Sequence, residues 1–170
     1  MRWSDVDLNE GVITVRRTLL AVAGEIVEGE PKTKRGRRRI DLDHATTAAL
    51  KAHRKAQAEV RLLMGAGYQA DTDASGGFVF ARPDGAPWNP DTVSQAFDRL
   101  VARYGLRRIT FHGLRHTHAS HLLAAGVNIK VVSERLGHAS VSFTLDTYGH
   151  VMPGQQAQAA ASAAALVDSM

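Results

Sequence analysis

The first quarter of the chain carries short apolar runs of the kind that form β-strands. Between Gly11 and Leu42 the runs VITV, LLAV and IDL are rich in β-branched and apolar residues, and glycine-bearing turns and a basic stretch separate them. Short strands joined by such turns pair in antiparallel fashion. The pattern therefore predicts a small antiparallel three-stranded sheet at one edge of the fold.

Helical patterns fill most of the remaining chain. Residues 43–64 have apolar positions at helical spacing and are followed by Gly65 and Gly67, which predicts one long helix. The loop DTDASGG and an apolar stub with a Pro-Asp-Gly turn come next. Asn89 and Pro90 then mark the start of a helix through DTVSQAFDRLVARY.

Three further helices are predicted in the last third, each with a capping residue at its start. The pairs of cap and terminating residue are Thr110 with Gly126, Asn128 with Gly137, and Ser140 for a helix that carries Tyr148 near its end. The tail, QQAQAAASAAALVDSM, favours helix by its alanine content but has little to bury, so we expect it to dock on another surface. The predicted fold class is α+β, mostly α-helical.

Length and charge narrow the class of protein. The 170 residues predict a single domain, 1–170. There are 21 Lys and Arg against 17 Asp and Glu, a net charge of +4, which favours a polyanionic partner. Six of the basic side chains lie in KTKRGRRR, residues 32–39, so the positive field is local.

Two absences exclude other classes of protein. No apolar run approaches the ~18 residues of a membrane span, and the first residues lack a signal peptide, so we expect a soluble, cytoplasmic protein with no membrane partner. The sequence contains no cysteine, which excludes disulfides, thiolate catalysis and Cys-based zinc sites. Any chemistry must therefore use oxygen and nitrogen groups.

Four residues of the last third are of types that handle phosphate: His112, Arg115, His138 and Tyr148. Arg115 can fork onto phosphate oxygens, and His112 lies three residues earlier, on the same face of a helix. His138 follows Leu-Gly, where the chain turns, so its imidazole is expected at a helix junction. An imidazole exchanges protons near neutral pH.

The fourth residue, Tyr148, supplies a hydroxyl. A phenol is a poor nucleophile until positive charge or a base favours its phenolate. Phosphodiester cleavage by such a hydroxyl needs fixed cations for the nonbridging oxygens and a proton donor for the leaving 5′ oxygen. Alone, a tyrosine at a helix end more often packs with its hydroxyl in water. The four residues together predict the breaking of a DNA backbone without metal.

The chain resembles the catalytic domain of the tyrosine recombinases, the phage integrase family. The matching blocks cover nearly the whole chain in the family's order: WSDVDL, PKTKRGRRRIDL, NPDTVSQAF, FHGLRHTHAS, LGHAS and TLDTYGHV. The resemblance implies a tyrosine that attacks the scissile phosphate to give a 3′-phosphotyrosyl link and a free 5′ hydroxyl. That hydroxyl then attacks the partner strand, and no metal or cofactor takes part.

The resemblance also implies roles for single residues and for partners. The implied site is Tyr148 as nucleophile, Arg115 as the second of two phosphate-binding arginines, His112 and His138 as phosphate ligands and aids to proton transfer, and Lys32, or alternatively Lys34, as general acid. The implied partners are double-stranded DNA attachment sites and other protomers in a tetrameric synapse, with the carboxy-terminal segment packed on a neighbour.

One departure from the family pattern affects these expectations. Family members carry a first catalytic arginine on a helix just before the Trp-Ser-Asp segment, whereas this chain opens with Met1, Arg2 and Trp3, and Arg2 is not at the corresponding position. We therefore expect a catalytic domain that lacks this helix and the amino-terminal DNA-clamping domain.

Three alternatives stand beside the recombinase. A noncatalytic DNA-binding remnant would keep the fold without cleaving. A helix-turn-helix DNA-binding protein would use residues 128–147, which have a glycine in the predicted turn. A zinc site would use the histidines around His112 and His116, but Gly113 stands where the zincin motif needs glutamate.

Overall fold

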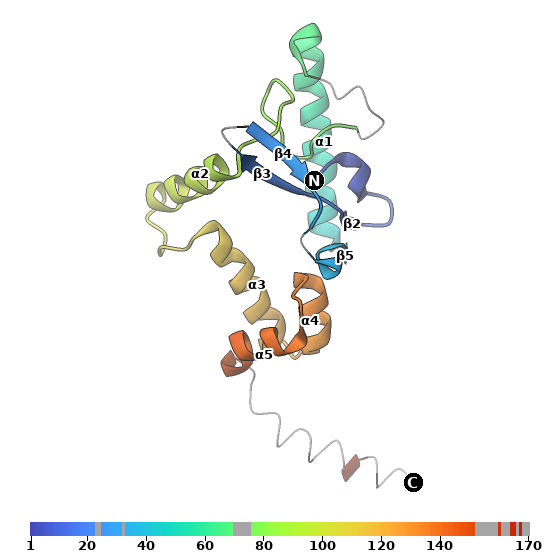
Figure 1. Ribbon diagram of the computed structural model, residues 1–170, viewed down its shortest axis with the longest axis vertical. Coiled ribbons are helices and arrows are strands. Elements are labelled where there is room, and N and C mark those ends of the chain that lie inside the picture. The colour runs from blue at the N-terminus through green and yellow to red at the C-terminus, as the bar shows by residue number, and fades with distance from the viewer. Residues whose placement is uncertain are drawn as a thin grey trace. The chain divides into compact units, whose positions relative to one another are not determined.

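The computed structural model describes residues 1–22, 25–31, 33–69 and 76–151, together with residues 160, 164, 165 and 167. Contacts within the chain divide it into two compact units, residues 1–111 and 112–170, and each is described by itself. All described strands lie in the first unit, and the described elements of the second are helical (Figure 1). No helix in the described ranges is both long and apolar enough to cross a membrane.

The first unit combines two small sheets with two long helices. Its strands and helices are β1 Val6–Asp7, β2 Val12–Val15, β3 Thr18–Val22, β4 Glu25–Gly29, β5 Arg38–Asp41, α1 His44–Met64 and α2 Pro90–Arg103, with short 3-10 turns at Trp3–Asp5, Lys34–Gly36 and Gly65–Gly67. The long helix predicted over residues 43–64 and the helix predicted after Asn89 are both present. Their capping side chains, Asp43 and Asn89, accept hydrogen bonds from backbone N–H groups of the first turn.

The strands pair differently from the prediction that VITV, LLAV and IDL form one three-stranded sheet. An antiparallel three-stranded sheet is present, in the order β1-β2-β5. The LLAV run, however, lies in β3, which pairs with β4 as a separate antiparallel hairpin, and the two-residue strand β1 completes the larger sheet. The reason is local: the backbone groups of β3 find their partners in residues 25–29, the next strand along the chain.

The core of the first unit lies where α1 meets the start of the chain. Trp3, Leu50 and Val79 are its buried residues. The indole of Trp3 donates a hydrogen bond to Gln57 Oε1 (2.6 Å), and the Gln57 amide donates to the Phe78 carbonyl (3.0 Å). One glutamine thus ties the amino-terminal turn to the segment around residue 78. These bonds satisfy polar groups that packing would otherwise leave unpaired.

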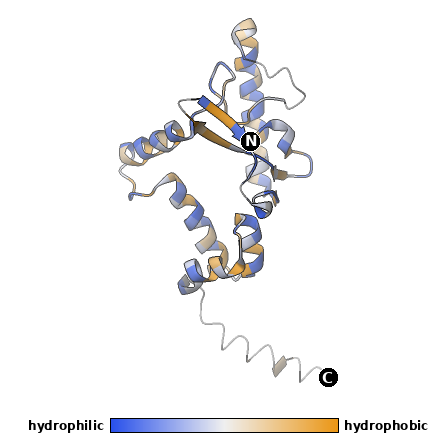
Figure 2. Cartoon of the chain, in the orientation of Figure 1, coloured by the Kyte–Doolittle hydropathy of each residue, from blue (hydrophilic) through white to orange (hydrophobic). Residues whose placement is uncertain are grey.

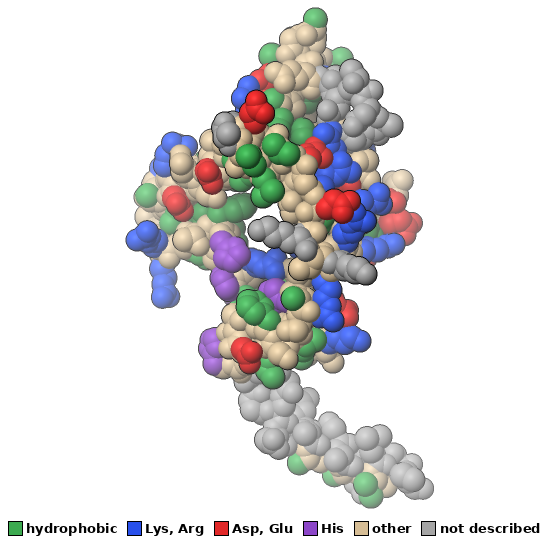
Figure 3. Space-filling view, in the orientation of Figure 1, with side chains coloured by type: hydrophobic (Ala, Val, Ile, Leu, Met, Phe, Trp, Pro, Cys, Tyr) green, Lys and Arg blue, Asp and Glu red, His purple; other side chains and the backbone are tan. Residues whose placement is uncertain are grey.

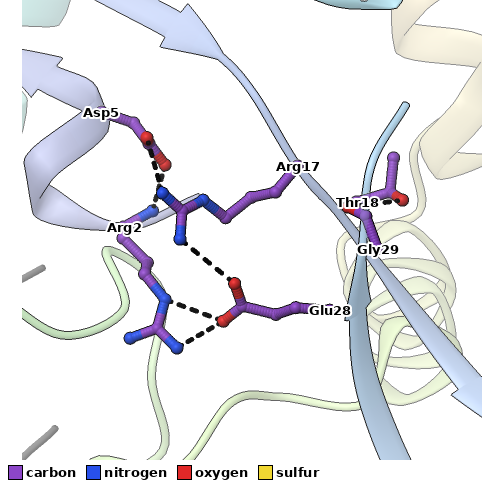
Figure 4. Close-up of polar contacts among 6 residues, drawn as sticks. All are labelled: Arg2, Asp5, Arg17, Thr18, Glu28 and Gly29. Carbon is purple, nitrogen blue, oxygen red and sulfur yellow. Dashed lines mark hydrogen bonds and ion pairs between the residues drawn. The ribbon is translucent and has the colours of Figure 1, made fainter. Parts of the chain in front are cut away.

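A network of four charged side chains, Arg2, Asp5, Arg17 and Glu28, connects the amino-terminal turn to the hairpin of β3 and β4 (Figure 4). Arg17 binds Asp5 at 3.3 Å and Glu28 at 3.2 Å, and Arg2 Nε donates to Glu28 Oε1 at 2.7 Å. Asp5 is buried. The network therefore fixes the base of the hairpin whose second strand leads into the basic stretch 32–39.

The second unit is built from three helices. They are α3 Phe111–Ala124, α4 Ile129–Leu136 and α5 Val141–Tyr148, followed by a 3-10 turn at Gly149–Val151. The predicted caps of α4 and α5 are confirmed: Asn128 and Ser140 each accept a backbone N–H bond in the first turn. Gly137 ends α4 in the left-handed conformation, with φ 72°.

Apolar residues from all three helices form one core. Its buried members are Ala119, Leu123, Val132, Leu136 and Tyr148. Each of the three helices carries both hydrophobic and hydrophilic positions (Figure 2). Tyr148 is therefore part of the hydrophobic core of the unit as well as a candidate for chemistry. The alanine-rich tail that follows lies mostly outside the described residues.

Candidate active site

Tyr148 lies at the end of α5 and is only 3% exposed. Its ring packs among the apolar side chains of the core, and its hydroxyl is within 2.7 Å of Nδ1 of His116 on α3. The ring centroids of these two residues are 5.7 Å apart. The hydroxyl is thus hydrogen-bonded to protein, which differs from the water-exposed hydroxyl of an ordinary tyrosine at a helix end.

The ring of His138 is also near that of Tyr148. It follows Gly137, whose left-handed turn directs the chain back toward α5, and it is 8% exposed, as expected for a helix junction. The two rings are parallel within 5°, with centroids 6.3 Å apart. His138 Nδ1 is 2.8 Å from the hydroxyl of Thr144, which is fully buried one turn before Tyr148 on the same helix. That hydrogen bond fixes the orientation of the imidazole.

Arg115 joins α3 to the end of α4. Its Nη2 donates a hydrogen bond of 2.5 Å to the carbonyl of Leu136, one of the last carbonyls of α4, which have no partner within their own helix. The bond holds a permanent positive charge beside the turn that carries His138. A guanidinium has five N–H donors, and this hydrogen bond uses one of them.

His112 is exposed near the start of α3. Its ring meets that of His116, one turn later, edge to face, with centroids 5.0 Å apart and planes at 80°. Ring contacts therefore run in series from His112 through His116 and Tyr148 to His138. Histidine side chains are visible on the surface around α3 (Figure 3).

The second unit thus brings together four of the five predicted site residues. His112, His138 and Tyr148 belong to the series of ring contacts, and Arg115 is bonded to the helix that leads into His138. The fifth, Lys32, lies outside the described residues, and for Lys34 only the backbone, in a 3-10 turn, is described.

Several cations of the basic stretch are held by nearby groups. Arg37 pairs with Glu30 (2.5 Å), Arg39 with Asp41 (3.6 Å), and Arg38 donates to the Gly36 carbonyl (3.1 Å). On the visible face of the first unit, blue Lys and Arg side chains lie among red Asp and Glu (Figure 3). Arg37 and Arg39 are exposed, so a polyanion can reach them.

Two residues of this cluster, His116 and Thr144, are absent from the set inferred from sequence. His116 is hydrogen-bonded to the Tyr148 hydroxyl, and Thr144 to His138. The signal available for His116 is its spacing of four from His112, which places both on one helical face, but from sequence alone that spacing suggests only a zinc pattern. The signal for Thr144 is its position one turn before Tyr148.

The other histidines of α3 do not form a metal cluster with this site. Within the described ranges, no group of three His, Asp or Glu side chains is close enough to hold a metal ion. His118 Nε2 instead accepts a hydrogen bond from Arg135 Nε at 3.0 Å. Burial first, and then the positive charge of Arg135 and the nearby His121, lower the pKa of His118, which suits its role as an acceptor.

Comparison with known proteins gives a consistent assignment. The phage integrase family matches residues 1–154. A XerC-like tyrosine recombinase of Caldanaerobacter subterraneus is 32% identical over 168 residues, covering 94% of this chain and 42% of its relative. The ICEBs1 integrase of Bacillus subtilis is 30% identical over 160 residues, and the match again covers 94% of this chain and 42% of its relative. The chain thus spans less than half the length of these two curated relatives.

Solved structures agree with the sequence relatives. The Tn1549 transposon integrase, in complex with circular intermediate DNA, is similar with a TM-score of 0.76 at 26% identity, covering 98% of this chain and 53% of that one. The XerA recombinase has the same fold, with a TM-score of 0.62. On the extent of the family match and the agreement of fold, this chain belongs to the phage integrase family.

Proposed function

We propose that residues 1–170 are the catalytic domain of a site-specific DNA recombinase, which cuts and rejoins DNA through a 3′-phosphotyrosyl intermediate. One observation carries the proposal: the hydroxyl of a buried tyrosine, Tyr148, is hydrogen-bonded to one imidazole and its ring lies near a second, with the guanidinium of Arg115 bonded to the helix that leads into the second. Membership of the phage integrase family supports it.

In the proposed reaction the Tyr148 oxygen forms a bond to phosphorus, and the bond from phosphorus to the 5′ oxygen breaks. Negative charge grows on the nonbridging oxygens, where Arg115, His112 and His138 would donate hydrogen bonds or positive charge. The leaving 5′ oxygen needs a proton, which we assign to Lys32, with Lys34 as the alternative. The free 5′ hydroxyl of a partner strand reverses these steps to reseal the DNA.

Attack also requires movement, because the Tyr148 ring is buried in the core of its unit. We propose that DNA binding draws the end of α5 outward while the phenol oxygen stays within hydrogen-bonding reach of His116, whose exposed side chain can follow it. Within the described part of the chain, α5 is followed by Gly149 and a single 3-10 turn, which the phenol can move with.

The proposed substrate is duplex DNA at attachment sites. Exposed arginines of the basic stretch would meet the phosphate backbone, which contributes affinity rather than sequence selection. The Tn1549 integrase is described in complex with DNA, which supports this substrate class. We further propose that other protomers complete a tetrameric synapse on DNA in the cytoplasm. Sedimentation of the protein with and without a duplex site would test that assembly.

The test of cleavage uses a duplex nicked next to the scissile phosphate, so that the short released strand diffuses away and the covalent complex accumulates. We expect a protein–DNA adduct that survives denaturing electrophoresis. Tyr148→Phe should abolish it. Tyr104→Phe is the matched control, because Tyr104 is 67% exposed and lies at the end of α2, in the other unit; this variant should form the adduct normally.

Two other results would support a noncatalytic protein or a different nucleophile. Salt-sensitive DNA binding by the wild type with no adduct would support a noncatalytic DNA-binding protein. An adduct that persists in Tyr148→Phe would overturn the assignment of the nucleophile.

A further inference from the structure

The hydrogen bond between Tyr148 and His116 joins residues 32 apart in sequence, on α5 and α3. The phenol oxygen and Nδ1 are 2.7 Å apart, so one of these two atoms donates a hydrogen bond to the other. A phenol has a single proton, and a neutral imidazole has one unprotonated nitrogen. If the phenol donates, the unprotonated nitrogen is Nδ1, and His116 is placed to receive the proton that Tyr148 must lose.

Burial makes such an acceptor necessary. The Tyr148 side chain is 3% exposed, and an anionic oxygen in an apolar site is costly unless its proton has a nearby base and the charge has partners. His116, in contrast, is an exposed residue whose ring reaches into the site. Its imidazole therefore connects a buried hydroxyl with solvent, where a proton can be released.

Neither of the other two imidazoles has this geometry. The His138 ring is parallel to that of Tyr148 with the centroids 6.3 Å apart, and its Nδ1 is hydrogen-bonded to Thr144. His112 contacts the ring of His116. Among the histidines of this cluster, His116 is the one whose nitrogen is hydrogen-bonded to the reacting oxygen.

We propose that His116 is the general base of the reaction. This inference rests on the proposed function. As the Tyr148 oxygen bonds to phosphorus, its proton passes to Nδ1 of His116 and leaves an imidazolium, while the bond from phosphorus to the 5′ oxygen breaks and that oxygen takes a proton from the general acid. On resealing, the imidazolium returns its proton to the phenol oxygen. The edge-to-face contact with His112 would keep the His116 ring in its orientation during both steps.

The direction of the hydrogen bond can be measured on the chain alone by ¹⁵N NMR of its histidines. We expect His116 to carry its proton on Nε2 and to show Nδ1 as an unprotonated acceptor. Tyr148→Phe should change the Nδ1 shift, because it removes the donor. A neutral His116 protonated on Nδ1 would overturn the proposal, since that tautomer donates to the phenol oxygen and has no acceptor there.

Kinetics on the nicked duplex test the role in catalysis. His116→Asn places an amide oxygen near the position of Nδ1, so it keeps an acceptor but takes no proton at neutral pH. His116→Ala removes the ring. We expect both variants to form the adduct about 100-fold more slowly or worse, the usual contribution of a general base. Added imidazole should restore part of the rate of His116→Ala, because the position is exposed, and none of the rate of His116→Asn.

His121→Asn, an exposed histidine on the same helix, is the matched control and should react at the wild-type rate. An adduct formed at that rate by His116→Asn or His116→Ala would overturn this inference and leave the proposed function standing. A wild-type protein that forms no adduct would overturn both. Should His116→Ala fail to fold, His116→Asn alone decides, because it retains the hydrogen bond.

Discussion

Glu28 is the side chain through which two arginines hold the β3–β4 hairpin. Burial alone would raise the pKa of its carboxyl, but the hydrogen bonds and positive charges of Arg2 and Arg17 outweigh burial and hold the pKa below its ordinary value. Arg2 also lies 4.3 Å above the ring of Phe78, so the same guanidinium serves an ion pair and a cation–π contact.

Replacing this carboxylate gives a prediction with a defined pH dependence. Glu28→Gln should lower the free energy of unfolding at pH 7 by about 1–3 kcal/mol, because two charge-assisted hydrogen bonds are weakened. A depressed folded-state pKa stabilises the fold above the ordinary glutamate value and loses that effect as pH falls through the folded pKa. Urea titrations at several pH values should therefore show wild type and variant converging below the ordinary value of 4.5. A pH-independent difference would contradict the assignment.

Sequence predicted most of the candidate site at the level of residues. Tyr148, Arg115, His112 and His138 carry the required chemistry in their residue types and stand in ordered motifs, and these two properties are visible without coordinates. The sequence does not indicate His116, because its proposed function depends on a hydrogen bond with a residue on another helix. Spacing within α3 gives its helical face but not the side chain that it meets.

At the scale of elements, helix ends were predictable and strand partners were not. A cap acts within its own first turn, so Asn89, Asn128 and Ser140 mark their helices through contacts two or three residues away. Strand pairing is not local in this way. The pattern predicts the run 19–22 as a third strand of the main sheet, but it pairs with β4, in which Glu25 and Glu28 interrupt the apolar pattern of a strand.

The turn between α4 and α5 gives a prediction at this scale. Gly137 has φ 72°, a conformation that costs a residue with a Cβ roughly 1–2 kcal/mol. Gly137→Ala should therefore lower the free energy of unfolding by about that amount. Gly137→Asn should lose less, because asparagine tolerates the left-handed region.

Urea denaturation of the two variants measures the difference. Equal losses for alanine and asparagine would show that space, and not backbone conformation, limits this position. Because His138 is the next residue, Gly137→Ala should also disturb the parallel contact of its ring with Tyr148.

For the whole molecule, the distribution of charge matters more than the net +4. Acidic side chains pair with several of the cations, as Arg2, Arg17 and Arg37 show. Exposed Arg35 and Arg39 belong to the basic stretch, whereas exposed Lys51 and Lys55 lie on α1. Local placement of charge, and not its total, should therefore govern DNA binding.

The salt dependence of DNA binding shows whether the local placement of charge or the net charge governs affinity. Arg35→Gln/Arg39→Gln should reduce the slope of log K against log salt by about 2, close to 0.9 for each phosphate that the variant no longer neutralises. Lys51→Gln/Lys55→Gln makes the same change in net charge on α1 and should leave the slope almost unchanged. Fluorescence anisotropy at several salt concentrations measures both. Equal slopes for the two double variants would mean that net charge alone sets affinity.

The burial of Tyr148 links chemistry to folding in this protein. The same ring fills the centre of a three-helix unit and is proposed to leave it in order to join DNA. On that proposal, the unit would have a void where an aromatic side chain normally packs while the ring is attached to a strand, and resealing the strand would let the ring return. In the proposed reaction, refilling of this core would favour resealing of the DNA, and the covalent protein–DNA state would be the one in which the unit unfolds most easily.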